Sequence, residues 1–463
     1  MVDKTIESTP LWLDIKSVID SGKKPVKYEY RGMLHNVKED VSIYKITSID
    51  IIRDYAGNIS DHIQIEFKML LGDYMKRLYP YKANLEFSVK RIELKEVSSD
   101  REDNSLIYTE KYKAIFLTGE NPAPAMTDLE SLDTETLNKG SLVDVKLQLL
   151  NRSLEPIRIK TVSGIFRQVT QKKIMYNILA GESAKILIDG KSSIDGIDIV
   201  DPDNIEVRKH VVIPDGTLIS NLPTFLQEKS GGVYNSGIGT YLQKYNNKTI
   251  WFIYPLFNYH RFDKDIFKIV FFAVPEYRLS GIDRTYNEEG KTLKILVTSK
   301  RKYKDSGETS LMNKGVGFRM ADARSFMKKP VAMTEEGPIS KRANTNHEVS
   351  LRSRNDGLNY APVVKASSNP FKEYSKLILS DLGQIDLVWE NSNHDLIHPG
   401  MPCKYVFQGK DKPIELKGVV MFTHTLISLE DSNVYKNITH ITLACESYNT
   451  DPDVPEFEAV GEF

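Results

Sequence analysis

The chain has 463 residues, of which 40% are hydrophobic and 27% charged, so it is a globular protein too long for one ordinary core. Its 62 basic and 63 acidic residues give a formal net charge of -1, which argues against holding nucleic acid by an overall positive charge. Two cysteines, Cys403 and Cys445, are too few for a disulfide framework. The sequence shows no secretory signal and no apolar run near the roughly 20 residues of a membrane-spanning helix. We therefore expect synthesis in a cytoplasm and folding without a membrane.

The N-terminal part predicts a helix followed by a β domain. Residues 1–23 form a helical segment, in which Thr9-Pro10 is a start signal and Leu11, Ile15 and Val18 share one face. From residue 24 to residue 150 the apolar period changes to two, which indicates strands with one wet and one dry face. Six or so such strands predict a first antiparallel β-barrel or sandwich.

The middle of the chain, residues 151–258, predicts a mixed α/β module. Apolar spacing indicates a helix over Ser163 to Leu179. A second unit follows a turn at Pro214 to Gly216: a small helix over 218–229, a stop at Gly231-Gly232, and a buried strand over Ile250 to Phe257. This arrangement is typical of packing, because no catalytic side chain stands in it.

Strand patterns return after the module. Residues 259–298 are expected to join it to a second β-barrel at 363–450. Between them, residues 299–362 lose apolar periodicity and predict an extended loop or arm. The tail 451–463 has five acidic and no basic residues. The fold class expected is thus β-rich α+β, with two antiparallel β-barrel domains flanking a mixed module and a long arm.

Motifs for chemistry are weak. His394-x3-His398 has metal-like spacing, but Asn, Ser, Pro and Gly around it indicate a loop. Gly315-Val316-Gly317 starts like a dinucleotide fingerprint and then departs from it, and the basic run Lys300 to Lys304 is typical of a solvated loop. The aromatic cluster between Trp251 and Phe262 favours core and protein interface over a stacking platform. We expect no enzyme activity, no cofactor and no metal site.

Taken as a set, three pieces resemble the central baseplate hub protein family of contractile-tailed bacteriophages and related injection systems. The first is the amphipathic segment Ser163 to Leu179 after the first barrel. The second is IPDGTLISNLPTFLQEKSGG, from Ile213 to Gly232, followed by TIWFIYPLF. The third is the run His398 to Phe407, in which Pro399-Gly400 precedes a strand, with Gly418-Val419-Val420 and His424 beyond it. The resemblance covers roughly residues 24–450.

The resemblance implies a structural virion protein: a homotrimeric hub that adapts a six-fold tail tube above it to a three-fold central spike below it. It implies contacts with baseplate wedge proteins and a central channel that DNA crosses without stable binding. The place implied is the virion tail baseplate, after assembly in the host cytoplasm. The acidic tail is then a candidate partner-docking segment through Glu456, Phe457, Glu458 and Phe463. The alternatives are another tail protein, such as a wedge, tube initiator or fibre adaptor, and a β-rich carbohydrate-active enzyme.

Overall fold

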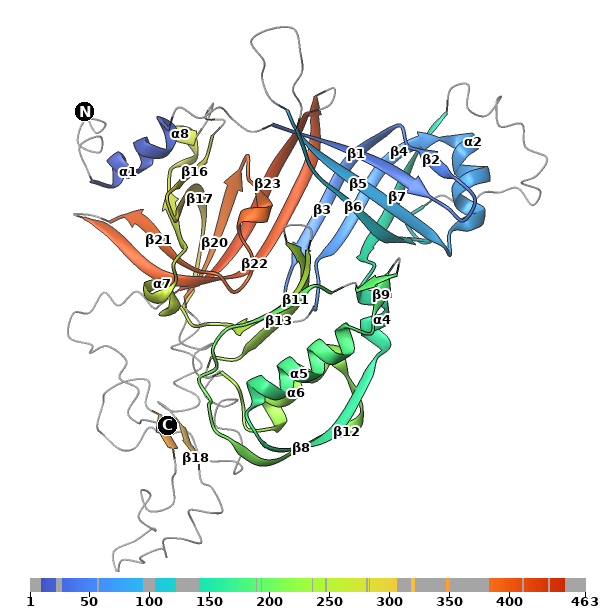
Figure 1. Ribbon diagram of the computed structural model, residues 1–463. Helices are drawn as coiled ribbons and strands as arrows, with labels where there is room; N and C mark the ends of the chain where they lie inside the picture. Colours follow the sequence, from blue (N-terminus) through green and yellow to red (C-terminus); the bar gives the residue numbers. More distant parts are fainter. Residues whose placement is uncertain are drawn as a thin grey trace, which may run out of the picture.

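The computed structural model describes most of the chain outside the arm and the termini. The described residues are 10–21, 27–55, 58–94, 105–121, 141–188, 190–192, 194–234, 236–245, 248–279, 282, 284–305, 318–320, 347–349, 383–409, 412–431 and 434–445. They form two strand rings that lie side by side, with a mixed module beneath them (Figure 1).

The first ring closes through eight strands. Its members pair in the order β1-β5-β6-β7-β4-β3-β22-β23, and a single register pair, Tyr28 with Tyr435, returns β23 to β1. All of these pairings are antiparallel, as the sequence predicts. The strands are β1 (Lys27–His35), β3 (Lys45–Arg53), β4 (His62–Leu70), β5 (Leu85–Leu94), β6 (Ser105–Phe116), β7 (Leu142–Asn151), β22 (Pro413–Asp431) and β23 (Val434–Cys445).

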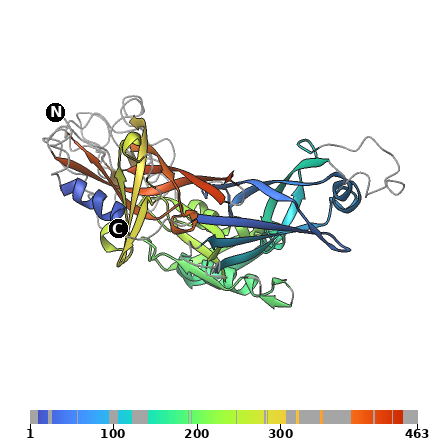
Figure 2. The same ribbon diagram turned by 90° about the horizontal axis from the view of Figure 1, so that it is seen from above.

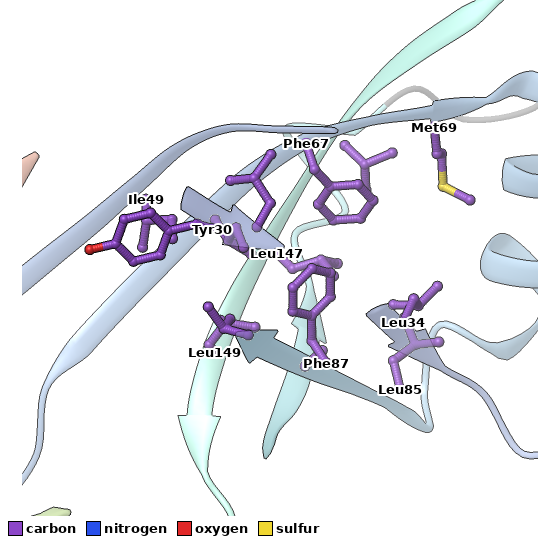
Figure 3. Packing of buried hydrophobic residues seen from close by; sticks show 14 of the residues in the cluster. Tyr30, Leu34, Ile49, Phe67, Met69, Leu85, Phe87, Leu147 and Leu149 are labelled. Atoms are coloured by element: carbon purple, nitrogen blue, oxygen red, sulfur yellow. The ribbon is translucent and has the colours of Figure 1, made fainter. Parts of the chain in front are cut away.

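The alternating apolar residues of these strands fill the ring. Phe67 of β4 and Phe87 of β5 are fully buried, and their rings lie 5.3 Å apart (Figure 3). Leu147 of β7 and Ile49 of β3 pack into the same core. One end is covered by the short helices α2 (Leu71–Asp73), η1 (Tyr74–Leu78) and η2 (Tyr79–Tyr81), and β2 (Asp40–Ser42) pairs with β1 outside the ring.

The second ring closes through six strands in the order β15-β21-β22-β23-β20-β17, with β17 paired back to β15. Its other strands are β15 (Lys268–Ala273), β17 (Thr292–Asp305), β20 (Gly383–Glu390) and β21 (Pro402–Gln408), and β16 (Tyr286–Glu289) pairs with β17 at its edge. Two details differ from the sequence-based expectation. First, β15 runs parallel to both of its neighbours, so this ring is not wholly antiparallel. Second, the strands of 259–298 belong to the ring itself, because Phe271 and Ile295 share one core with Leu387 and Leu443.

The long hairpin of β22 and β23 is common to both rings. Val420 packs into the second core and Ile427 into the first. A register irregularity between Val420 and Phe422 interrupts the pairing near the crossover. Between the two cores the hairpin turns Thr423, Thr425 and Thr439 inward, and all three are at most 1% exposed.

The module has its own core beneath the rings. A two-stranded ribbon of β8 (Thr161–Val169) and β12 (Arg208–Leu218) arches around α5 (Gln171–Ser183) and α6 (Leu222–Lys229) (Figure 1). A three-stranded sheet of β11 (Gly196–Ile199), β14 (Lys248–Pro255) and β13 (Ile238–Tyr245) lies between the helices and the rings. The remaining pieces are α4 (Leu154–Ile159), η3 (Ile219–Asn221), β9 (Leu187–Ile188) and β10 (Lys191–Ser192).

One helix prediction in the module is partly wrong. The expected helix over 163–179 is a strand up to Val169 and becomes a helix only at Gln171. Val162 packs inward while Ser163 and Ile165 are exposed, which is a strand alternation. Thr170 then caps the helix, because its side chain accepts a hydrogen bond from Lys173 N at 3.4 Å. The small helix, the double-glycine stop and the strand predicted after Gly216 are present, with Gly231 and Gly232 both at positive φ.

The N-terminal helix α1 (Pro10–Ile19) covers the outside of the second ring. Leu11, Ile15 and Val18 pack against Phe272 and Leu296. The short helices α7 (Arg261–Lys264) and α8 (Glu276–Leu279) flank the same ring, and seen from above the two rings lie in one row (Figure 2). Within the predicted arm, the described pieces are the end of β17 and the paired β18 (Phe318–Met320) and β19 (His347–Val349). The rest of 299–362 and the tail 451–463 lie outside the described residues.

Candidate functional site

The rings and the module meet at a loop that joins β20 to β21, residues 391–401, which we name the junction loop. It contains the single 3-10 turn η5 (His394–Leu396). The second ring anchors its first part, because Ser392 N donates to Asn437 O at 3.1 Å and the Ser392 hydroxyl bonds the Thr439 hydroxyl at 2.7 Å. At its far end Gly400 N donates to Val420 O at 2.7 Å. The loop is thereby held rigidly at both ends while its middle reaches the first ring.

Arg91 of β5 is the first contact of that loop with the first ring. Its side chain is 1% exposed and forms an ion pair with Asp395, while Nη2 donates to Asn393 Oδ1 at 3.1 Å. The guanidinium also lies over the ring of Tyr28, 3.9 Å from the centroid. A buried guanidinium needs such partners, since an unpaired buried charge costs several kcal/mol. Arg91 therefore ties β5 to the junction loop.

Arg53 of β3 is the second contact. Its Nη1 donates to the backbone oxygens of His394 at 2.6 Å and Ile397 at 3.3 Å. Its Nε donates to Asp61 Oδ2 at 3.1 Å. Asp61 also accepts a hydrogen bond from the Tyr55 hydroxyl. One guanidinium thus links the junction loop to the β3–β4 connection.

The same network continues into the module. The ring of Tyr55 stacks on Tyr241 of β13, with centroids 3.9 Å apart and planes 13° apart. Tyr241 in turn stacks on Phe252 of β14 at 4.9 Å. Beside it, Tyr254 packs so closely over Gly400 that a Cβ on that glycine would lie 2.1 Å from the ring. First ring, second ring and module are therefore joined by one cluster of side chains.

The electrostatics of the cluster favour a fixed charge pattern. Burial by itself would raise the pKa of the Asp395 carboxyl, but the neighbouring His394, Arg91 and Arg53 outweigh it and hold that pKa well below its usual range. Burial lowers the pKa of His394 to about 3 and that of His398 to about 3, so both imidazoles are neutral near pH 7. The net result is one carboxylate committed to two guanidinium groups, an arrangement suited to locking a loop.

A cleft of about 1460 Å³ opens beside the junction loop. All three units line it, through β6 of the first ring, β13 of the module and the start of β15. On its wall the Tyr112 hydroxyl donates to Glu110, and Lys244 Nζ lies 3.7 Å from the same carboxylate. Burial raises the pKa of Glu110, although the bond from Tyr112 and the charge of Lys244 oppose the rise. The wall is thus polar and internally paired.

The structure places the candidate residues of the sequence as follows. His394 and His398 are both buried in the junction loop, at 2% and 7% exposure. Within the described residues, no group of three or more His, Cys, Asp or Glu side chains is arranged to hold a metal ion. Trp251 and Tyr254 are buried in the module, as expected for core aromatics. The tail residues Glu456, Phe457, Glu458 and Phe463, and Gly315 to Gly317, lie outside the described residues, as do the side chains of Lys300 to Lys304.

Sequence reasoning missed Arg53 and Arg91, although a signal exists for each. Arg91 continues the inward series Leu85, Phe87 and Val89 at a spacing of two. Arg53 does the same after Ile49 and Ile51. A buried cation at an inward strand position needs an acceptor from elsewhere in the chain. That acceptor, Asp395, stands in a loop with no pattern of its own.

Comparisons with known proteins give structural neighbours only. No protein family and no curated protein matches the sequence. The fold resembles the tail protein from Neisseria meningitidis MC58, with 10% identity, a TM-score of 0.44, and 90% of this chain and 96% of that chain covered. It also resembles a 43 kDa tail protein of prophage MuSo2 from Shewanella oneidensis, with 10% identity, a TM-score of 0.44, and coverage of 89% and 97%.

A third neighbour is the E. coli c3393 protein, a component of the type VI secretion system with structural similarity to the T4 bacteriophage tail proteins gp27 and gp5. Its identity is 8% and its TM-score 0.39, with 90% of this chain and 77% of that chain covered. The structural neighbours are thus phage-type tail proteins and a type VI secretion component. None of the helices in the described part of the chain has the length and apolarity needed to cross a membrane.

Replacing Asp395 with alanine should destabilise the protein by about 1–3 kcal/mol, because Arg91 is left buried without its carboxylate; the loss stays below that of a fully buried pair since Asp395 is 43% exposed. The free energy of unfolding in urea measures the loss. The matched control is Lys404→Met, which breaks an exposed pair with Glu415 at 2.6 Å and should cost less than about 1 kcal/mol. Equal effects of the two variants would show that the junction loop is not held by charge.

Acidification should destabilise the protein between pH 6.5 and pH 3. The unfolded histidines bind protons below about pH 6.5, whereas the pKa values of folded His394 and His398 are about 3. The unfolded state therefore binds more protons in this window, and stability present above pH 6.5 is lost as the pH falls. The expected loss is about 2 kcal/mol per histidine between pH 6.5 and pH 5.

The variant His398→Gln should flatten this pH dependence, which urea unfolding at a series of pH values measures. His210→Gln is the control, since His210 is exposed on β12. An unchanged slope in His398→Gln would contradict the assignment.

Proposed function

We propose that this chain is a structural component of a contractile tail or related injection machine: a baseplate hub that works as a homotrimer. It adapts a six-fold tail tube to a three-fold central spike and lines the channel between them. Its role is mechanical and not enzymatic. The proposal rests on the resemblance of the sequence motifs and on the architecture of the two rings.

One observation carries the proposal: a single chain builds two closed strand rings that lie side by side and share one hairpin. Three copies around an axis would present six rings to the six-fold tail tube. The assembly itself would keep the three-fold symmetry of the spike. A two-ring chain is therefore suited to meeting both symmetries at once.

The shared sheet offers a surface suited to a channel wall. On its outer side, one transverse row runs through Gln64, Asp50, Leu426 and Ile438. The next row runs through His62, Ile52, His424 and His440. These rows cross from the first ring to the shared hairpin without a lysine or arginine. His424 Nε2 and Asp50 Oδ1 are paired at 2.6 Å, and Gln148 Nε2 and His62 Nδ1 lie 3.1 Å apart. The next row on the same face, through Ser48, Ser428 and Lys436, does carry a lysine, which is paired with Glu390 at 3.4 Å, so these rows offer few free basic groups to DNA phosphates.

The partners proposed are a tail tube protein above the rings, a central spike protein below them and wedge proteins around them, in the virion baseplate. Obligate interfaces of this kind commonly bury about 2,000–5,000 Å². The exposed apolar side chains of the described residues, which include Ile159, Ile205, Phe267 and Tyr277 at 70–79% exposure, are compatible with surfaces that a neighbour covers.

The purified chain should assemble into particles of three times 52.8 kDa, about 158 kDa, because the hub role requires three copies. Light scattering after size exclusion at micromolar concentration measures this mass, alone and with the spike protein of the same machine. A 52.8 kDa monomer under both conditions would contradict the proposal.

Deleting the acidic tail 451–463 should weaken the complex with the spike protein at least tenfold and leave the unfolding transition unchanged. Phe457 and Phe463 are the expected anchors, with Glu456 and Glu458 beside them. Pull-down of the spike at graded concentrations measures the loss. Substituting Asp451 and Asp453 with asparagine is the control that keeps the aromatic anchors. Unchanged co-purification after deletion would dismiss the tail as a docking segment.

A further inference from the structure

The cleft beside the junction loop has an aromatic lining. Its volume of about 1460 Å³ exceeds the roughly 300–1,000 Å³ typical of small-molecule sites, so a chain segment fits it better than a small molecule. Six Tyr and Phe side chains line it, and of these Phe267 is 74% exposed while Tyr108, Tyr112 and Phe252 are half-buried. Aromatic-lined grooves of this kind bind extended, proline-containing segments.

The cleft also carries a surplus of positive charge. Nine Lys and Arg side chains line it, against six Asp and Glu side chains. On the wall of the first ring, Lys111 and Arg152 share one carboxylate, Glu86, at 2.6 and 3.2 Å. Elsewhere on the lining, the side chains of Lys264 and Lys291 have no hydrogen-bond or ion-pair partner among the described residues. A negatively charged segment would therefore be attracted into the cleft.

The two lysines without partners lie beside the most exposed aromatic ring. Phe267 stands between α7, which ends at Lys264, and β15. The backbone N–H of Lys268 donates to Lys291 O at 2.9 Å, which holds the residue before β17 beside Phe267. The exposed carboxylate of Glu288 lines the cleft as well, so two such lysines face one such carboxylate. This part of the lining thus combines an apolar contact with a positive charge.

The acidic tail 451–463 has the composition that such a lining recognises. It has five acidic and no basic residues, and Pro452 and Pro455 form a Pro-x-x-Pro motif. Its larger apolar residues recur at every third position: Val454, Phe457, Val460 and Phe463. In a polyproline-type conformation three residues complete one turn, so these four side chains would share one side. Glu456 and Glu458 would then lie on the other two sides.

The chain leaves the described structure close to the cleft. Ala444, the last residue but one of β23, packs with Phe257, four residues before the cleft-lining Arg261. Residues 446–450 can span about 18 Å before the tail begins. A tether this short holds the tail at an effective concentration of roughly millimolar order around the cleft. The tail of the same chain is therefore the occupant that reaches the cleft most readily.

We infer that the cleft receives the acidic tail 451–463 of its own chain. Phe457 packs against Phe267, and the carboxylates on either side of Phe457 pair with Lys264 and Lys291. The same tail is proposed above to dock on the spike, so the cleft holds it in the free chain and competes with the spike for it. The contact with the cleft does not depend on the hub role.

A synthetic peptide of residues 451–463, labelled at its N-terminus, tests the contact by fluorescence anisotropy. The tail-deleted chain should bind it, and the full-length chain should bind it at least tenfold more weakly, because its own tail fills the cleft. Lys264→Glu combined with Lys291→Glu should weaken binding to the tail-deleted chain at least tenfold, and so should Phe267→Ala. Lys229→Glu is the matched control, since Lys229 is exposed at the end of α6 and does not line the cleft.

A second measurement keeps the full-length chain. Lys291→Cys combined with Glu458→Cys should close a disulfide within one chain under mild oxidation, which non-reducing electrophoresis and peptide mapping detect. The native Cys403 and Cys445 are buried and should not react. Lys229→Cys combined with Glu458→Cys is the control and should give at most a tenth of that yield. Circular dichroism confirms that every variant is folded.

The outcomes separate this inference from the proposed function. Equal peptide binding by the charge-reversed variant, or by a scrambled peptide of the same composition, overturns the contact. A two-chain product in place of the bond within one chain assigns the cleft to the tail of another copy and overturns it too. A peptide that does not bind the cleft, while tail deletion still weakens the spike complex, overturns this inference and leaves the spike-docking proposal standing.

Discussion

The pairing of half-exposed Asp395 with the buried guanidinium groups of Arg91 and Arg53 is the constraint on which the rest of the structure depends. The two arginines belong to different strands of the first ring, while the carboxylate belongs to a loop of the second. Hydrogen bonds from Arg53 to the backbone oxygens of His394 and Ile397, and from Arg91 to Asn393, add to this contact between the junction loop, β3 and β5. Because each guanidinium is at most 5% exposed, neither can be left unpaired without a large loss of stability. The relative position of the rings is therefore specified by charge and not by apolar packing alone.

The shared hairpin explains why a charged junction is needed. β22 and β23 carry apolar residues into both cores, but at the crossover they turn threonines inward. The bond between the Thr425 and Thr439 hydroxyls at 2.9 Å satisfies two of these groups without adding apolar contact. At the crossover the hairpin therefore contributes backbone and hydroxyl bonds and few apolar contacts. The junction loop braces that crossover from the side.

The brace also fixes the walls of the cleft. The Tyr55–Tyr241 stack sets the module against the first ring, and Tyr254 packs on Gly400 of the loop. The cleft lies beside these two fixed contacts, so its walls are preformed. Preformed surfaces lose little conformational entropy on binding. A stiff junction suits a protein whose proposed role is to transmit symmetry and force.

Local sequence determined the strands of both rings, the small helix after Gly216 and its glycine stop, because apolar spacing and turn residues act over a few neighbouring positions. The prediction for residues 163–169 was wrong. Apolar spacing assigned this segment to the helix that starts at Gln171, but inward Val162 and outward Ser163 and Ile165 show that it belongs to a ribbon strand. Tertiary structure alone decided ring closure, the sharing of β22 and β23, and the partner of Arg91, which lies 304 residues away. No periodicity spans that distance; only the cost of a buried unpaired charge selects the pair.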